Sequence, residues 1–102
     1  MDNHFITFNK DEIIFLEGQS SDCAYIIESG KVGIYREDSL GNRFLVRELG
    51  NKELFGEMSL IDKYPRSATA IALKNTRCMI VERSRFDYMT KFHPHFTVSL
   101  IK

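Results

Sequence analysis

Residues 24–36 read AYIIESGKVGIYR and contain a strong strand signal. Two runs rich in β-branched and aromatic residues, Ala24 to Glu28 and Val32 to Arg36, flank Ser29 and Gly30. Such runs favour strands, and a glycine between them favours a tight turn. The stretch therefore predicts two strands joined as a hairpin.

Similar short runs lie on both sides of this stretch: Ile13 to Leu16, Phe44 to Leu49, Ala68 to Leu73 and Arg77 to Glu82. Residues that tolerate tight turns separate them, and the strand pattern is interrupted only between residues 50 and 66. Roughly eight short strands at regular spacing predict a mainly β domain, an antiparallel barrel or jelly roll that closes its own edges.

The last quarter of the chain changes to a helical pattern. Ser84 followed by Asp87 resembles a capping box, which predicts a helix from about Arg85 to Phe92. Pro94 ends that helix, and a further short helical piece is expected over Phe96 to Ile101.

The composition limits the class of protein. With 102 residues, 43% hydrophobic and 27% charged, the chain is long enough for one compact domain over residues 1–102. Fourteen basic side chains balance fourteen acidic ones, so the basic excess of a nucleic-acid or anionic-membrane binder is missing. Any anion must therefore be bound locally.

The amino-terminal residues and the cysteines indicate a compartment. The start, MDNH, lacks the positive and apolar stretches of a signal peptide, and no apolar run approaches membrane-spanning length. Cys23 and Cys78 have neither metal-motif spacing nor the density of a disulfide scaffold, so they are expected to be reduced, buried thiols. We expect a cytoplasmic protein.

The densest chemical signal is FGEMSLIDKYPRSATA, residues 55–70. A short helix is expected to start near Gly56, where the backbone can approach a ligand and the first N–H groups lack intrahelical acceptors. Those donors suit a phosphate, and Arg66 can offer phosphate oxygens a bidentate fork. Ser67 adds a hydroxyl and an amide.

Glu57 has a different role in this segment. A carboxylate that shared the phosphate would repel it, so Glu57 is expected to hold a neutral donor, and a ribose hydroxyl fits. One acid for a sugar and one arginine for a phosphate describe a nucleotide monophosphate.

The chain resembles the cyclic nucleotide-binding domains of cAMP receptor proteins, kinase regulatory subunits and cyclic-nucleotide-gated channels. The phosphate-binding cassette of that family is similar to Phe55 to Leu60 followed by Pro65 to Thr69, and its upstream strands are similar to Phe15 to Gly18 and Tyr25 to Val32. The resemblance implies an antiparallel β-roll, double-stranded and jelly-roll-like, with a short cassette helix and a C-terminal helix.

The resemblance also implies a role for each site residue. Glu57 would bind the ribose 2′-hydroxyl, Arg66 the exocyclic phosphate oxygens, and Ser67 with nearby amides the phosphate. The ligand would also lie against four more cassette residues and three base-facing residues: Gly56, Met58, Ser59, Ala68, Ile34, Val46 and Leu49. The ligand would be cAMP in preference to cGMP, with no cofactor and no metal.

The sequence departs from the family pattern in three places. Asp11 and Lys52 stand where the family usually has glycine, and Asn51 is expected to take the positive φ beside Lys52. The long helix that usually covers the base is at most begun at residues 96–102, so discrimination between cAMP and cGMP is expected to be shallow.

Two other functions fit the same fold. An interaction domain with a vestigial pocket would not need the intact Glu57 and Arg66. A cupin-like metal enzyme needs clustered strand ligands, whereas His93 and His95 flank Pro94 at a helix end and are expected at the surface. We therefore expect a regulatory binding domain without enzymatic activity, which acts through an effector domain or partner protein outside these residues.

Overall fold

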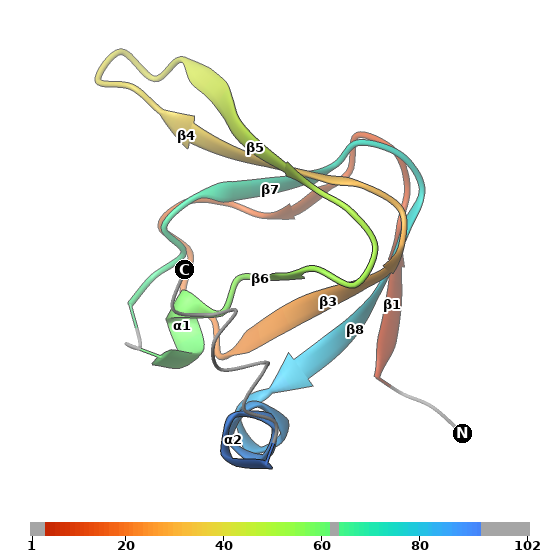
Figure 1. Cartoon of the computed structure of the whole chain (residues 1–102). Helices are drawn as coiled ribbons and strands as arrows, with labels where there is room; N and C mark the ends of the chain where they lie inside the picture. Colours follow the sequence, from red (N-terminus) through yellow and green to blue (C-terminus); the bar gives the residue numbers. More distant parts are fainter. Residues whose placement is uncertain (1–3, 62–63, 93–102) are drawn as a thin grey trace.

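The computed structural model describes residues 4–61 and 64–92, and within these ranges eight strands form two facing antiparallel sheets (Figure 1). The first sheet has the spatial order β1 (Phe5–Phe8), β8 (Thr76–Glu82), β3 (Cys23–Ser29) and β6 (Leu54–Phe55). The second sheet has the order β2 (Ile13–Phe15), β7 (Thr69–Ala72), β4 (Val32–Glu37) and β5 (Arg43–Leu49). This arrangement confirms the predicted antiparallel β-roll.

Two helices complete the described fold. α1 (Met58–Ile61) lies between β6 and β7, and α2 (Arg83–Phe92) follows β8 directly. Figure 1 shows both helices near β3 and β8. The Arg83 guanidinium donates a 2.7 Å hydrogen bond to the Leu60 carbonyl oxygen, so the first residue of α2 is tied to α1.

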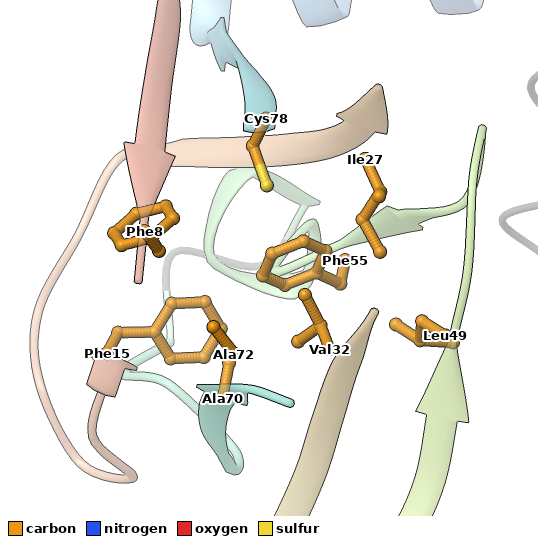
Figure 2. Packing of buried hydrophobic residues seen from close by; sticks show 9 residues of the cluster. All are labelled: Phe8, Phe15, Ile27, Val32, Leu49, Phe55, Ala70, Ala72 and Cys78. Atoms are coloured by element: carbon orange, nitrogen blue, oxygen red, sulfur yellow. The ribbon is translucent and has the colours of Figure 1, made fainter. Parts of the chain in front are cut away.

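The main hydrophobic core lies between the two sheets (Figure 2). Its buried residues come from both: Phe8, Phe15, Ile27, Val32, Leu49, Phe55, Ala70, Ala72 and Cys78. Full burial of one large apolar side chain contributes about 1.5–3 kcal/mol, so this cluster is the main source of stability. Phe15 and Phe55, whose ring centroids are 5.9 Å apart, form the end of the core nearest the cassette.

A second cluster packs the helices onto the first sheet. Leu60 of α1 and Phe86 of α2 meet Ala24 of β3 and Val81 of β8. β3 therefore has both faces covered, because Ile27 points into the main core while Ala24 points to the helices. This explains why residues 24–27 are continuously apolar instead of alternating.

The predicted hairpin at Ser29 and Gly30 is wrong. β3 and β4 do not pair, because this turn carries the chain from the first sheet to the second. Gly30 has φ 129°, and a Cβ there would overlap Thr76, so the corner requires glycine. The Lys31 N–H donates to Thr76 Oγ1 at 3.1 Å, which fixes the corner against β8.

Two other local predictions are corrected. α2 begins at Arg83, so Ser84 lies inside its first turn and is not the N-cap. The positive φ near residue 51 belongs to Lys52 (73°), whereas the Asn51 side chain accepts a hydrogen bond from the Gly30 N–H at 3.0 Å. Asp11 also takes a positive φ, 72°.

Other differences concern element ends. The short helix starts at Met58, two residues after Gly56, and β6 lies in the segment where no strand was predicted.

The predicted burial of the cysteines is confirmed for one of the two. Cys78 is buried, but Cys23 is only half-buried. His93, His95 and the helical piece expected over residues 96–101 lie outside the described residues.

Candidate functional site

One pocket lies between the β4–β5 hairpin and the segment from β6 to β7. Nine of the ten predicted site residues line it: Ile34, Leu49, Gly56, Glu57, Met58, Ser59, Arg66, Ser67 and Ala68. Four further lining residues were not among the predicted ligand contacts, although Phe55 was predicted as the start of the cassette: Phe15, Arg47, Leu54 and Phe55. The cassette and the strand wall opposite it therefore form one concave surface.

Arg66 is the most unusual residue of the pocket, because only 4% of it is exposed. Its Nη1 donates to the Gly56 carbonyl oxygen and its Nη2 to Ser21 Oγ, both at 2.7 Å. Its guanidinium carbon lies 4.0 Å from the centroid of the Phe15 ring, a cation–π contact. No carboxylate of the described residues lies within 4.0 Å of this guanidinium, so the buried cation has no counter-ion there.

The backbone holds Arg66 in this place. The Arg66 N–H donates to the Gln19 carbonyl oxygen at 2.8 Å, and the Arg66 carbonyl oxygen accepts from the Gly18 N–H at 2.7 Å. These bonds join the β2–β3 loop to the chain just after Pro65. The arginine therefore starts from a fixed backbone position and does not depend on a mobile surface turn.

Two buried polar atoms in the pocket have no hydrogen-bond partner. One is Nε of Arg66, and the other is the hydroxyl oxygen of Ser59, a residue with 2% exposure. Leaving buried polar groups unpaired costs about 1–3 kcal/mol each. Such groups are expected where a ligand completes the hydrogen bonding.

Gly56 and Glu57 form the turn into α1. Gly56 has φ 78°, and a Cβ there would lie 2.7 Å from Nη1 of Arg66, so a side chain would be strained and would displace the arginine. Desolvation raises the pKa of the half-buried Glu57 above its ordinary value of 4.5, while Arg47 and Arg66 act in the opposite direction. Glu57 is thus a carboxylate held in the pocket at an electrostatic cost.

The aromatic wall behind Arg66 adds no negative charge. The Tyr25 ring is stacked on Phe55 at 5.3 Å between centroids and lies 6.0 Å from the Arg66 guanidinium carbon. Burial, with a smaller contribution from Cys23, raises the pKa of Tyr25 to about 12. The phenol is therefore neutral at physiological pH and leaves the charge of Arg66 available to an external anion.

Val46 does not line the pocket, in contrast to its predicted place beside the base. The strand register pairs Ile34 with Arg47 and Tyr35 with Leu45, so Val46 is the extra residue of a β-bulge. Arg47 and Leu49, two positions apart, both line the pocket, while Val46 is 54% exposed. The sequence could have shown that Val46 and Leu49 do not both face the pocket, because residues 46 and 49 face opposite sides of a regular strand.

A second and larger hollow lies over β8 and α2. Its volume is about 580 Å³, against about 140 Å³ for the cassette pocket, and it is lined by His4, Met79, Glu82, Ser84, Arg85 and Tyr88. None of these six residues is buried. The cassette pocket, with its buried unpaired cation, is therefore the better candidate site despite its smaller volume.

The part of the chain that the structure describes contains no group of three His, Cys, Asp or Glu side chains arranged to hold a metal ion. No helix of that part is long and apolar enough to cross a membrane.

Comparison with known proteins identifies the family of this site. Residues 5–91 match the family described as cyclic nucleotide-binding domain. The chain belongs to this family.

The relatives of this cyclic nucleotide-binding domain include regulators. A CRP-like cAMP-activated global transcriptional regulator of Mycobacterium tuberculosis is 30% identical over 97 residues, which are 95% of this chain and 43% of the relative. The crystal structure of the Thermus thermophilus catabolite activator protein superposes with a TM-score of 0.85 at 31% identity, covering 95% of this chain and 47% of that one.

Another relative has been solved with two nucleotides. The EAL enzyme Bd1971 has a cAMP-bound and a cGMP-bound form, each with a TM-score of 0.75 and 44% identity over 79% of this chain and 22% of that one. This cyclic nucleotide-binding domain spans less than half the length of the curated relatives that it matches.

Proposed function

We propose that the domain reversibly binds a 3′,5′-cyclic nucleotide, prefers cAMP to cGMP, and performs no chemistry on it. The observation that carries this proposal is the buried Arg66, whose Nε has no partner and which no carboxylate of the described residues neutralises. A buried cation is costly unless it is paired. A singly charged cyclic phosphate would supply the pair.

The other cassette residues match the remaining parts of such a ligand. Glu57 lines the same pocket as Arg66, so a carboxylate acceptor for the ribose 2′-hydroxyl lies beside the phosphate cation. Ser59, Ser67 and the cassette backbone supply polar groups around the phosphate. Opposite the cassette, Ile34 and Leu49 give the base an apolar surface.

Two observations support binding without catalysis. The Ser59 hydroxyl, the buried hydroxyl of the pocket, has no hydrogen-bond partner and so no adjacent base to activate it. Residues 5–91, which include the pocket residues, also match a family described as a binding domain. For the nucleotide preference, the support is that two relatives carry cAMP in their descriptions, whereas the Bd1971 neighbour has been solved with either nucleotide.

We propose a conformational output that passes through α1. Leu60 is buried against Phe86 of α2, and its carbonyl oxygen accepts from Arg83. A cassette that moves onto a phosphate would shift α1 and with it α2, provided that the ligand binds one arrangement more tightly. The output would reach an effector domain or a partner protein, as expected for a domain shared with longer regulators.

An interaction domain with a vestigial pocket is the alternative within the same fold. Arg66 opposes it, because a pocket without a ligand would retain a buried, unpaired cation at a cost in stability.

Calorimetric titration of the 102-residue chain with cAMP, cGMP and 5′-AMP tests the proposal. Both cyclic nucleotides are expected to bind at one site per chain, at least about tenfold more tightly than 5′-AMP, because only the cyclic phosphate is fixed to the ribose in the geometry of Arg66 and Glu57. Heats indistinguishable from dilution with both cyclic nucleotides would leave the interaction domain as the better reading. Metal analysis of the same sample tests the cupin-like alternative.

A further inference from the structure

The β2–β3 loop, residues 16–22, has no role in the function proposed above, yet it surrounds the phosphate-binding arginine. Gly18 and Gln19 hold the Arg66 backbone from both sides, with hydrogen bonds of 2.7 and 2.8 Å. Two residues after Gln19, Ser21 reaches the Arg66 guanidinium, although Ser21 and Arg66 are 45 positions apart in sequence. The loop therefore contacts both the backbone of Arg66 and the tip of its side chain.

Ser21 is itself held in place. It is half-buried, and its Oγ accepts the Arg66 Nη2–H at 2.7 Å. The same oxygen accepts a 3.3 Å hydrogen bond from the Cys23 N–H, and the Cys23 thiol lies 3.5 Å away. Because the Cys23 N–H also holds the Ser21 oxygen, this oxygen cannot move freely with the guanidinium. Ser21 therefore sets the position of Nη2.

The pattern of used and unused donors gives the guanidinium a direction. A guanidinium has five N–H donors in one plane. Gly56 accepts one from Nη1, and both Ser21 Oγ (2.7 Å) and the Cys23 sulfur (3.8 Å) accept from Nη2, whereas Nε has no acceptor. The Nε–H is therefore the buried donor of this guanidinium that is left for a phosphate oxygen.

We propose that Ser21 is a positioning residue for the ligand: its hydroxyl orients Arg66 so that the unpartnered Nε–H binds the phosphate. This inference rests on the proposed binding of a cyclic nucleotide. Phe15 restricts the guanidinium from its face, at 4.0 Å, and Gly56 restricts Nη1. Ser21 supplies the remaining restraint, because its hydroxyl prevents the guanidinium from rotating within its own plane. Loss of this hydroxyl should therefore weaken phosphate binding while the fold is retained.

The test compares side chains of matched shape at position 21. Threonine keeps the hydroxyl, and valine has nearly the same volume without it. In calorimetric titration with cAMP, Ser21→Val and Ser21→Ala are expected to bind about tenfold more weakly than the wild type, the range for loss of a charge-assisted hydrogen bond. Ser21→Thr is expected to stay within about threefold. The neighbouring exposed residue supplies the control, Ser20→Ala, which should bind as the wild type does.

A double-mutant cycle separates positioning from a general effect on the fold. In an Arg66→Lys background, Ser21→Val should have little further effect, because the compact ammonium has no planar fork to orient. Equal losses in both backgrounds would overturn the proposal, and so would binding by Ser21→Val that matches or exceeds that of Ser21→Thr.

If Ser21→Ala does not fold, the threonine and valine pair still decides the question. A wild-type chain that binds no cyclic nucleotide would refute the proposed function itself, which is a different result from wild-type binding that is insensitive to residue 21.

Discussion

The two ends of the pocket are built in different ways. At the cassette end, Arg66 is 4% exposed and held by hydrogen bonds from its backbone to the tip of its side chain. At the β5 end, residues 43–48 are all exposed, and the Arg47 side chain, 67% exposed, makes a 3.7 Å ion pair with Glu53. One end is preorganised and shielded from water, whereas the other is open.

This difference indicates where binding energy should come from. A charge in a dry, fixed environment interacts strongly with a ligand, because water neither screens it nor has to be reorganised. Contacts on an exposed strand are screened and contribute little. We therefore expect the phosphate and ribose to supply most of the affinity and the base to supply little of the selectivity.

Removing the charge at the cassette end should have the largest effect. Arg66→Ala is expected to weaken cAMP binding by about 2–4 kcal/mol, as for loss of a buried charge-assisted pair. Arg66→Lys should also be impaired, because an ammonium cannot reproduce the fork. Calorimetry measures the binding, and circular dichroism checks that the fold is retained.

The matched control for this prediction is Arg43→Ala. Arg43 lies on the exposed hairpin and pairs with Glu37 at 3.8 Å, so its removal should leave binding unchanged. Affinities of both Arg66 variants within twofold of the wild type would mean that the cassette end does not carry the binding energy.

The second prediction concerns the sugar contact of Glu57. Glu57→Gln is expected to cost about 1.5–3 kcal/mol with cAMP, the range for a hydrogen bond to a charged group. With 2′-deoxy-cAMP the same substitution should cost little, because the hydroxyl that it would bind is missing. The four affinities form a cycle whose coupling energy isolates this contact, and additive losses would place the hydroxyl elsewhere.

The third prediction concerns the open end. The preference for cAMP over cGMP is expected to stay below about 1.4 kcal/mol, which is tenfold in Kd. Ile34 and Leu49 offer an apolar surface to either base, while Arg47 could donate to the two acceptors, N7 and O6, of guanine. Arg47→Ala should therefore widen the cAMP preference slightly. Competition binding measures it, and a hundredfold preference would show that the open end recognises the base closely.

The smallest effect is expected on stability without ligand, and it concerns pH. Because the pKa of Glu57 is raised in the folded state, Glu57 binds more protons in the folded chain than in the unfolded chain above pH 4.5. The contribution of Glu57 to the free energy of unfolding must then fall as the pH rises through this range. Glu57→Gln lacks this loss, so its stability relative to the wild type should increase from about pH 4 to about pH 7. Urea unfolding at several pH values measures the difference, and parallel profiles would show that Glu57 is not desolvated.

Local patterns predicted the strands well, because alternation, β-branched runs and turn residues act over a few positions. The run from Val32 to Arg36 was predicted within one residue of β4, and that from Arg77 to Glu82 within one residue of β8. The cassette was also predicted from neighbouring residues, and all seven of the site residues proposed within it line one pocket. The bulge at Val46 and the sheet change at Gly30 were not predicted, because both depend on which strands pair.

Neighbouring residues were enough to predict six of the eight described strands, the position of the cassette, and Glu57 and Arg66 as its charged residues. Two features depend on how the sheets pack: β3 and β4 belong to different sheets, and Ser21 contacts Arg66. The physical reason is distance along the chain. Strand propensity and turn chemistry are properties of adjacent residues, whereas register, burial and a hydrogen bond across 45 positions arise only when the sheets pack together.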